Sequence, residues 1–416
     1  MAKSKKPGRL VMALKEVGLL RIGILSSLGL IGAWFAFALA VSGIARMKNP
    51  PLALMFVGND SAALAGQADQ LFFANPKSPP KASQSLALDA LREQALNPRA
   101  LRILGYYADA QSKTALAERY VRMAALLSRR EAGAQLWLVE ASARKNDTAQ
   151  TLIHYDNALR TAPDTATILF PRLLRAIEDR DIRTALKPYI RANDDWANRF
   201  LIFANSNSKN LPALVDLIVE TGGLPDGKAA QSQKLALLER LVGEKFYAEA
   251  RQLYLSMKGA QAAHLTNTAF ETSDRFGPMV WQLLNDPDAG SSILNSSPNG
   301  DKGGALSMSV YANAATTRAV ATKLLYLTPG NYTFLAKIAS LNLGDEGFLS
   351  WQVRCMSDGS RDPFWKLDSI STKPAAAFTV ASSCPVQRFD IVASGGTGQN
   401  GLEAVIANIS ISRQAQ

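Results

Sequence analysis

Cysteine and histidine, the residues most often used for nucleophilic or metal chemistry, are scarce in this chain. The 416 residues include two cysteines, Cys355 and Cys384, and two histidines, His154 and His264. Structural zinc sites draw on clustered Cys and His pairs, and neither histidine lies beside a nucleophile motif of the Ser-His-Asp or Cys-His type. We therefore predict no metal site, no cofactor and no catalytic residue, so the chain is not expected to be an enzyme.

Two other patterns in the sequence bear on catalytic chemistry. The glycine-rich stretch SGGTGQNG, residues 394–401, has no Lys-Ser/Thr and no following helix, so it is predicted to be a hairpin loop and not a phosphate loop. The acidic pairs Asp345-Glu346 and Asp286/Asp288 lie in apparent turns. A glycosidase needs two carboxylates at a set separation in a cleft, so a glycan-active enzyme is kept only as the third hypothesis.

Residues that could bind a ligand are easier to find. Trp365 stands in RDPFWKLDS among Pro, Asp and Lys, and exposed aromatics of this kind stack on sugar rings beside planar polar side chains. Arg354 and Gln352 belong to the predicted strand FLSWQVRCM, on the face opposite Trp351, which is assigned to the core. We predict a ligand site at Trp365, Arg354 and Gln352, the alternative being a packed Trp365 at the edge of a sandwich.

The strands that carry these residues come after an N-terminal segment that the sequence predicts to span a membrane. Residues 22–45 contain no charged residue, and roughly 20 apolar residues in a helix span a bilayer. Eight Lys/Arg and one acid lie within residues 1–48, a net charge of +7 out of +11. This asymmetry predicts a single-pass signal-anchor, with residues 1–21 as a basic cytoplasmic tail near the anionic lipid of the inner leaflet and the bulk of the chain across the membrane. A cleaved signal peptide is the alternative, because Ala38-Leu39-Ala40 has the small-residue pattern.

The charge distribution also bears on partners. The 368 residues after the N-terminal region carry only +4, so no basic surface is left for DNA or RNA, and no nucleic-acid partner is expected. Export to an oxidising compartment favours a disulfide between Cys355 and Cys384, 29 residues apart. Two unpaired core cysteines are the alternative.

The exported part divides into three regions by composition. Residues 46–82, with the Pro-rich pieces NPPLA and NPKSPPKA, are interpreted as a membrane-proximal spacer. Residues 83–260 have apolar residues at helical spacing. Residues 261–416 have short β-branched and aromatic runs separated by Gly, Pro, Asn, Asp and Ser, with strands predicted at 279–284, 305–312, 320–327, 331–340, 348–356, 375–382, 386–393 and 402–412.

The helical region repeats at 34 residues. Leu138 follows Leu104, and Ala158 follows Ala124, by this interval, while Tyr189 follows Tyr155. The pattern, with Gly105 and small residues in the second helix, resembles the tetratricopeptide repeat, whose unit is two antiparallel helices. A third unit is partial, because Arg172 and Leu173 stand where Leu and Gly are expected, and a fourth helix pair is predicted at 234–259.

The C-terminal region resembles another family. YLTPGNYTFLAKI, followed by FLSWQVRC and CPVQRFDIV, is similar to the jelly-roll β-sandwiches of carbohydrate-binding modules. The expected fold is therefore a multidomain chain, α plus all-β: a transmembrane helix, a tetratricopeptide-like α-solenoid and an antiparallel sandwich.

Two functional hypotheses remain open. In the first, the repeats bind an envelope protein and the sandwich binds polysaccharide, as in membrane-anchored proteins of surface-polysaccharide (exopolysaccharide) synthesis or export, which the layout resembles. In the second, the chain is a scaffold of a secretion or division complex and the sandwich is a structural cap. The partner, the pathway and the oligomeric state are not specified by the sequence.

Overall fold

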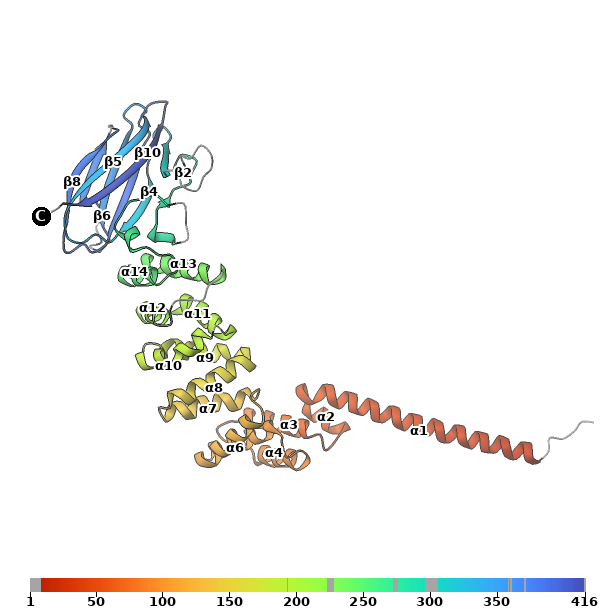
Figure 1. Ribbon diagram of the computed structural model, residues 1–416. Helices are drawn as coiled ribbons and strands as arrows, with labels where there is room; N and C mark the ends of the chain where they lie inside the picture. The colour runs from red at the N-terminus through yellow and green to blue at the C-terminus, as the bar shows by residue number, and fades with distance from the viewer. Residues whose placement is uncertain are drawn as a thin grey trace, which may run out of the picture. The chain divides into compact units, whose positions relative to one another are not determined.

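The computed structural model describes residues 9–414 except 193, 223–227, 272–275, 296–305, 358, 360, 370 and 371. The chain divides into two compact units, residues 1–169 and 170–416, which are described separately. Figure 1 labels the helices and strands used below.

The first unit begins with one long helix, α1 (Arg9–Lys48), followed by α2 (Pro50–Phe56). Within the described residues, Gly23–Lys48 of α1 is the one helical stretch that is long and apolar enough to cross a membrane, judged by length and composition. The charge-free run at 22–45 is therefore helical throughout, as the sequence predicts.

Three helical hairpins complete the first unit. They are formed by α3 (Ser61–Ala74) with α4 (Lys81–Glu93), α5 (Pro98–Ala110) with α6 (Thr114–Leu127), and α7 (Ala132–Arg144) with α8 (Thr148–Thr161). The 34-residue interval separates the starts of α5 and α7 and also those of α6 and α8. Residues 61–74, which the sequence assigns to a spacer, thus belong to the first hairpin.

Small residues set the distance between the paired helices. A Cβ on Gly105 of α5 would overlap the Val121 side chain and the Ala117 carbonyl of α6. Ala117, Val121 and Ala124 are fully buried. The close approach of the two helices is the packing that the repeat pattern predicts, and interiors of this density do not tolerate an added methyl group without movement.

The second unit contains further helices before the sandwich. They are α9 (Ala166–Ala176), which starts at the boundary between the units, α10 (Arg180–Arg191), α11 (Asp195–Asn207), α12 (Leu211–Glu220), α13 (Lys228–Gly243) and α14 (Tyr247–Leu255). The pair α13 and α14 matches the predicted fourth helix pair at 234–259. The helices α11 and α12 lie within the predicted helical region 83–260, in a stretch for which no repeat unit was predicted.

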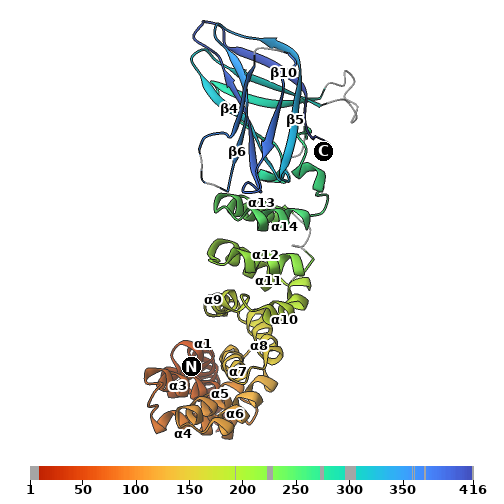
Figure 2. The same cartoon turned by 90° about the vertical axis from the view of Figure 1, so that its left-hand side faces the viewer.

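Residues after the helices form two five-stranded antiparallel sheets (Figure 2). One has the order β1-β4-β9-β6-β7, and the other β2-β3-β10-β5-β8. The strands are β1 (Gln282–Leu283), β2 (Ala289–Asn295), β3 (Leu306–Ala312), β4 (Thr317–Leu325), β5 (Gly330–Asn342), β6 (Phe348–Cys355), β7 (Trp365–Ser369), β8 (Ala375–Val380), β9 (Gln387–Ser394) and β10 (Leu402–Arg413). From β3 onward, each strand lies in the opposite sheet to the one before it, except that β6 and β7 are neighbours in one sheet. The last strand, β10, lies beside β3, which is the jelly-roll order.

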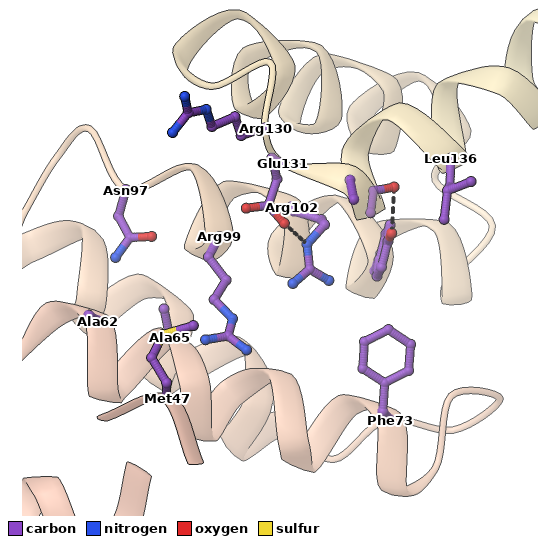
Figure 3. A pocket seen from close by; sticks show the side chains of 13 residues that line it. Met47, Ala62, Ala65, Phe73, Asn97, Arg99, Arg102, Arg130, Glu131 and Leu136 are labelled. Atoms are coloured by element: carbon purple, nitrogen blue, oxygen red, sulfur yellow. Dashed lines mark hydrogen bonds and ion pairs between the residues drawn. The ribbon is translucent and has the colours of Figure 1, made fainter. Parts of the chain in front are cut away.

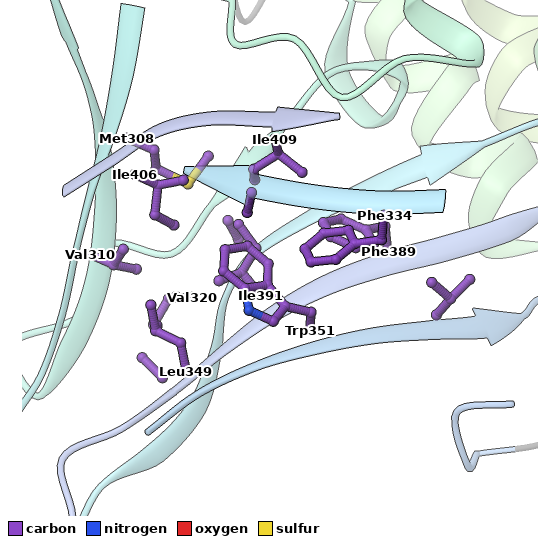
Figure 4. Close-up of a cluster of buried hydrophobic side chains, with 14 of the residues drawn as sticks. Met308, Val310, Val320, Phe334, Leu349, Trp351, Phe389, Ile391, Ile406 and Ile409 are labelled. Carbon is purple, nitrogen blue, oxygen red and sulfur yellow. The ribbon is translucent and has the colours of Figure 1, made fainter. Parts of the chain in front are cut away.

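The core lies between the two sheets (Figure 4). Trp351 of β6 is fully buried, with its ring centroid 5.2 Å from that of Phe334 and 6.4 Å from that of Phe389. The prediction that Trp351 faces the core is confirmed.

Three features of the sandwich differ from the sequence prediction. The strands β2 and β7 were not predicted, and the strand expected at 279–284 is reduced to two residues after a 3₁₀ turn. In β10, register shifts between Val405 and Asn408 bring both Ile406 and Ile409 into the core, which breaks simple alternation. The glycine-rich loop is not a hairpin, because β9 and β10 belong to different sheets.

The predicted disulfide is present. Cys355 ends β6, Cys384 lies in the turn before β9, and their Cα atoms are 5.6 Å apart, a separation that suits a disulfide. It joins two segments that the sheet already brings together, since Cys355 pairs with Gln387 across β6 and β9.

A charged side chain lies inside the sandwich. Lys323 of β4 has a fully buried side chain, its Nζ is 3.0 Å from Glu271 Oε1, and it faces the Trp281 ring at 5.8 Å. Burial lowers the pKa of Lys323, and Glu271 opposes that shift. His264 Nδ1 lies 3.7 Å from the same Glu271 oxygen. The ion pair between Lys323 of β4 and Glu271 therefore attaches the segment that follows α14 to the sheet.

We expect Cys384→Ser to lower the free energy of unfolding of the sandwich by about 3 kcal/mol, because the open loop gains conformational entropy when unfolded. Denaturant titration of the oxidised full chain, followed by tryptophan fluorescence, measures this change. The reduced wild-type protein is the control and should match the variant, while the helical circular dichroism signal persists. An unchanged midpoint would show that the bridge does not stabilise the fold.

We expect Lys323→Met to cost about 3–5 kcal/mol of stability, because it leaves the Glu271 carboxylate buried without its cation. The double variant Lys323→Met with Glu271→Leu removes both charges and should recover most of the loss. Thermal unfolding of the wild type, the two single variants and the double variant gives a double-mutant cycle, which measures the interaction energy of the pair. Purely additive losses would contradict a coupled pair.

Candidate functional site

An open groove runs along one side of the hairpins of the first unit (Figure 3). It has a volume of about 750 Å³, within the usual range for ligand pockets. The first helix of each hairpin contributes, namely α3, α5 and α7, together with the end of α1. The lining residues are Met47, Ala62, Ala65, Phe73, Asn97, Arg99, Arg102, Tyr106, Arg130, Glu131, Ala132, Gly133 and Leu136.

Arg102 holds these helices together. Its Nη2 lies 3.0 Å from Asp69 Oδ1 of α3, and its Nε donates to Glu131 Oε1 at the start of α7, 2.6 Å away. The side chain of Arg102 is 6% exposed, so the two carboxylates compensate a nearly buried cation. Burial acts to lower the pKa of Arg102, but Asp69, Tyr106 and Glu131 raise it overall.

Tyr106 forms the wall next to Arg102. The Arg102 guanidinium lies 5.1 Å from the Tyr106 ring centroid, and Tyr106 Oη donates a hydrogen bond of 2.7 Å to the Gly133 carbonyl. A Cβ on Gly133 would come within 2.6 Å of Arg102 Cδ and 2.8 Å of Tyr106 Oη. The groove wall therefore depends on glycine at position 133. Burial raises the pKa of Tyr106, with Arg102 opposing, so its hydroxyl remains a donor.

The groove combines an apolar surface with an excess of positive charge. Phe73, Met47 and Leu136 supply the apolar part, and Phe73 is 56% exposed. Arg99 is paired with Asp69 at 2.9 Å but keeps 28% of its side chain exposed. Arg130 is exposed and has no ion-pair partner within the described part of the chain. Arg99 and Arg102 are balanced by Asp69 and Glu131, which leaves the charge of Arg130 uncompensated. The groove therefore favours an extended, partly apolar ligand that carries a carboxylate.

The residues predicted as a ligand site do not share one face of the sandwich. Trp365 of β7 is paired in register with Val353, and its ring centroid lies 5.3 Å from Phe334 and 5.1 Å from Phe378, so it points inward and is half-buried. Gln352 and Arg354 lie on the opposite face of the same sheet. Trp365 is therefore packed at the edge of the sandwich, which is the alternative stated for it above.

On that outer face, the polar groups are largely paired with one another. The Asp390 side chain is fully buried, with Oδ2 3.0 Å from Arg354 Nε and Oδ1 2.9 Å from Arg388 Nε. Arg354 also donates to Gln352 Oε1 and to the Arg361 carbonyl. Burial raises the pKa of Asp390, and the two arginines oppose that shift. Few of these hydrogen-bonding groups remain for a ligand.

The outer face of the other sheet carries a second groove, of about 500 Å³. It is lined by Ser309, Val310, Tyr311, Ser340, Leu341, Asn342, Glu403, Ala404 and Val405. In register, Glu403 lies between Tyr311 of β3 and Asn342 of β5. The side chains of Glu403 and Asn342 are exposed and make no hydrogen bond with other residues that the structure describes.

Tyr311 is fixed on this surface. Its Oη donates to the Asp286 carbonyl at 2.6 Å, and a Cβ on Gly290 would come within 2.9 Å of its ring. The ring thus lies across Gly290 of β2 beside Glu403. The groove is lined by β3, β5 and β10, whose strands the sequence predicts, but the sequence does not show that these three strands lie side by side in one sheet. The alternation GLEAVIAN, which exposes Glu403 beside buried Leu402 and Ala404, was the available signal.

The histidines and acidic groups form no metal centre within the described ranges. No cluster of three or more His, Cys, Asp or Glu that could hold an ion occurs there. His154 is buried with Nδ1 2.8 Å from Gln135 Oε1, and burial lowers its pKa. It is therefore a packed residue of α8.

Comparisons with known proteins give limited information. No family model and no curated protein matches the chain. Among solved structures, TmCBM61, a protein solved in complex with β-1,4-galactotriose, matches with TM-score 0.23 and 10% identity, over 35% of this chain and 92% of that one. A structure described as CBM4 matches with TM-score 0.20 and 12% identity, over 36% and 94% of the two chains.

A third solved structure is the enzymatically active domain of tailspike protein 4 of bacteriophage CBA120. It matches with TM-score 0.24 and 14% identity, over 36% of this chain and 21% of that chain. At TM-scores of 0.20 to 0.24, these likenesses assign neither a ligand nor a family. The jelly-roll description of residues 289–413 rests on the strand order itself.

Proposed function

We propose that this protein is a membrane-anchored, non-enzymatic binding protein of the bacterial envelope. The groove of α3, α5 and α7 holds an extended segment of a partner protein, and the sandwich holds a neutral saccharide. The N-terminus lies in the cytoplasm and the bulk in the periplasm, as the lysines and arginines before residue 22 favour. We further propose that the helical hairpins are tetratricopeptide repeats and that the protein serves in exopolysaccharide synthesis or export.

The observation that carries this proposal is the groove around Arg102. A row of first helices presents an open surface with exposed apolar area at Phe73 and a positive side chain at Arg130. Both features suit an extended peptide that places an apolar side chain beside a carboxylate. Buried Arg102 already neutralises two carboxylates, so the cations available to a ligand are Arg130 and the exposed part of Arg99.

The saccharide proposal rests on the second groove of the sandwich. Tyr311 offers an aromatic surface, and Glu403 and Asn342 offer hydrogen-bonding groups without internal partners among the described residues. Residues 264–416 carry a net charge of −1, which gives no general attraction for an acidic polymer. A neutral sugar held by stacking and hydrogen bonds fits this surface. The scaffold hypothesis applies if no sugar binds.

We expect Arg130→Glu to weaken the binding of acidic, partly apolar peptides about tenfold, which corresponds to about 1.4 kcal/mol for one lost charge-assisted contact. Peptides selected from a random library on the full-length protein in detergent, measured by fluorescence anisotropy, provide the assay. Arg119→Glu on α6 makes the same charge change outside the lining residues and should have no effect. Equal losses in both variants would show non-specific electrostatics and would contradict the groove.

We expect Asn342→Ala to weaken the binding of neutral oligosaccharides about fivefold, the effect of losing one hydrogen bond. Gln352→Ala removes an amide from the opposite sheet and is the matched control. Glycan-array binding by the full-length protein, followed by calorimetry, measures both. Loss only in Gln352→Ala would place the site on the face predicted from sequence, and absence of any binding glycan would favour the scaffold.

A further inference from the structure

The short helix α2 runs back along the end of α1. The ring centroid of Phe56, the last residue of α2, lies 5.9 Å from that of Phe37 and 6.2 Å from that of Trp34. Both partners belong to the charge-free run at 22–45. A residue that follows the apolar segment in sequence therefore packs beside the middle of that segment.

Hydrogen bonds and close packing fix this arrangement. Ser42 Oγ of α1 donates to Asp60 Oδ2 at 3.0 Å, and Asp60 Oδ1 caps α3 by accepting from the amides of Ala62 and Ala63. A Cβ on Gly66 of α3 would come within 2.9 Å of Pro50 Cγ and 3.2 Å of the Arg46 carbonyl. The helices α1, α2 and α3 therefore meet without space for a side chain at this point.

The position of Phe37 gives the depth of Phe56. A hydrocarbon core of about 30 Å requires about 20 helical residues, and 24 are free of charge. If the span is placed as close to the N-terminus as possible, it ends near residue 41, and Phe37 then lies about 6 Å inside the hydrocarbon, at 1.5 Å per residue. Any other placement of the span puts Phe37 deeper. Phe56 must reach the same level.

The surface of α2 suits this depth. Residues 49–59 contain no charged side chain. Met55 is 82% exposed and Leu52 is 37% exposed, so one short helix presents a largely uncovered and a partly uncovered apolar side chain. Ile44 of α1 is 79% exposed, so the span itself also presents apolar surface at this end. Helices that lie in the interface bury their apolar face about 5–10 Å into the headgroup and acyl boundary.

We propose that α2 is a second membrane-contacting element, inserted into the outer leaflet beside α1, with Met55 and Leu52 in contact with lipid acyl chains. The occupant of this apolar face is the bilayer, because the face is continuous with the span through Phe56, Phe37 and Trp34. This inference rests on the proposed membrane anchoring. It adds that the first hairpin sits directly on the membrane surface.

Depth-dependent quenching tests the proposal on the full-length protein in phosphatidylcholine–phosphatidylglycerol vesicles. Both native cysteines are in the disulfide, so an engineered cysteine labelled with the fluorophore NBD is a unique probe. Met55→Cys is the test position. Leu126→Cys on α6, a position that is 85% exposed, is the matched control outside α2. Leu30→Cys, at a position that is 72% exposed, reports whether α1 is inserted in the bilayer.

We expect nitroxides on shallow acyl carbons to quench NBD at position 55 most strongly, and deep nitroxides to quench it at position 30. No acyl nitroxide should quench it at position 126. Quenching at 30 without quenching at 55 would overturn the insertion of α2 while leaving the anchor intact. A blue-shifted, unquenched probe at 55 would mean that protein, such as a second copy, covers the face. Absence of quenching at 30 would overturn the anchor and this inference together.

Discussion

A nearly buried guanidinium organises the first unit of this protein. Arg102 lies at the contact of α3, α5 and α7, and its charge is tolerable there only because Asp69 and Glu131 approach it from the neighbouring helices. Those two contacts fix the spacing of three successive first helices. Gly133 leaves the space in which Arg102 and Tyr106 lie. The groove surface is thus a consequence of how one charge is neutralised.

Compensation of a buried charge also accounts for the difference between the two outer faces of the sandwich. On the sheet that contains β6 and β9, burial of Asp390 requires Arg354 and Arg388, and Arg354 in turn engages Gln352. The polar groups satisfy one another, and the face resembles a structural surface. On the sheet that contains β3 and β10, Glu403 and Asn342 point to solvent beside a fixed aromatic ring. This unused hydrogen-bonding capacity is what supports the saccharide site proposed on this face.

The sequence predicts those features that depend on local period and composition. The apolar run, the 34-residue spacing of the hairpins, the inward face of β6 and the disulfide all follow from such patterns. The sequence left the position of Trp365 open between a ligand site and a packed sandwich edge. Pairing with β6 makes Trp365 the start of β7 and turns its ring toward Phe334. The bulge in β10 reverses an alternation that otherwise looks regular. Tertiary pairing decides both cases.

The groove and the membrane contact meet at the end of α1. Met47 lines the groove, whereas Phe37, ten residues earlier, packs against Phe56. At 1.5 Å per residue the two positions are about 15 Å apart along one continuous helix. If Phe37 lies about 6 Å inside the hydrocarbon, Met47 lies about 9 Å outside it, within the headgroup region. Under the proposed anchoring, the α1 end of the proposed peptide groove lies at the membrane surface, where the juxtamembrane segment of another membrane protein has direct access to it.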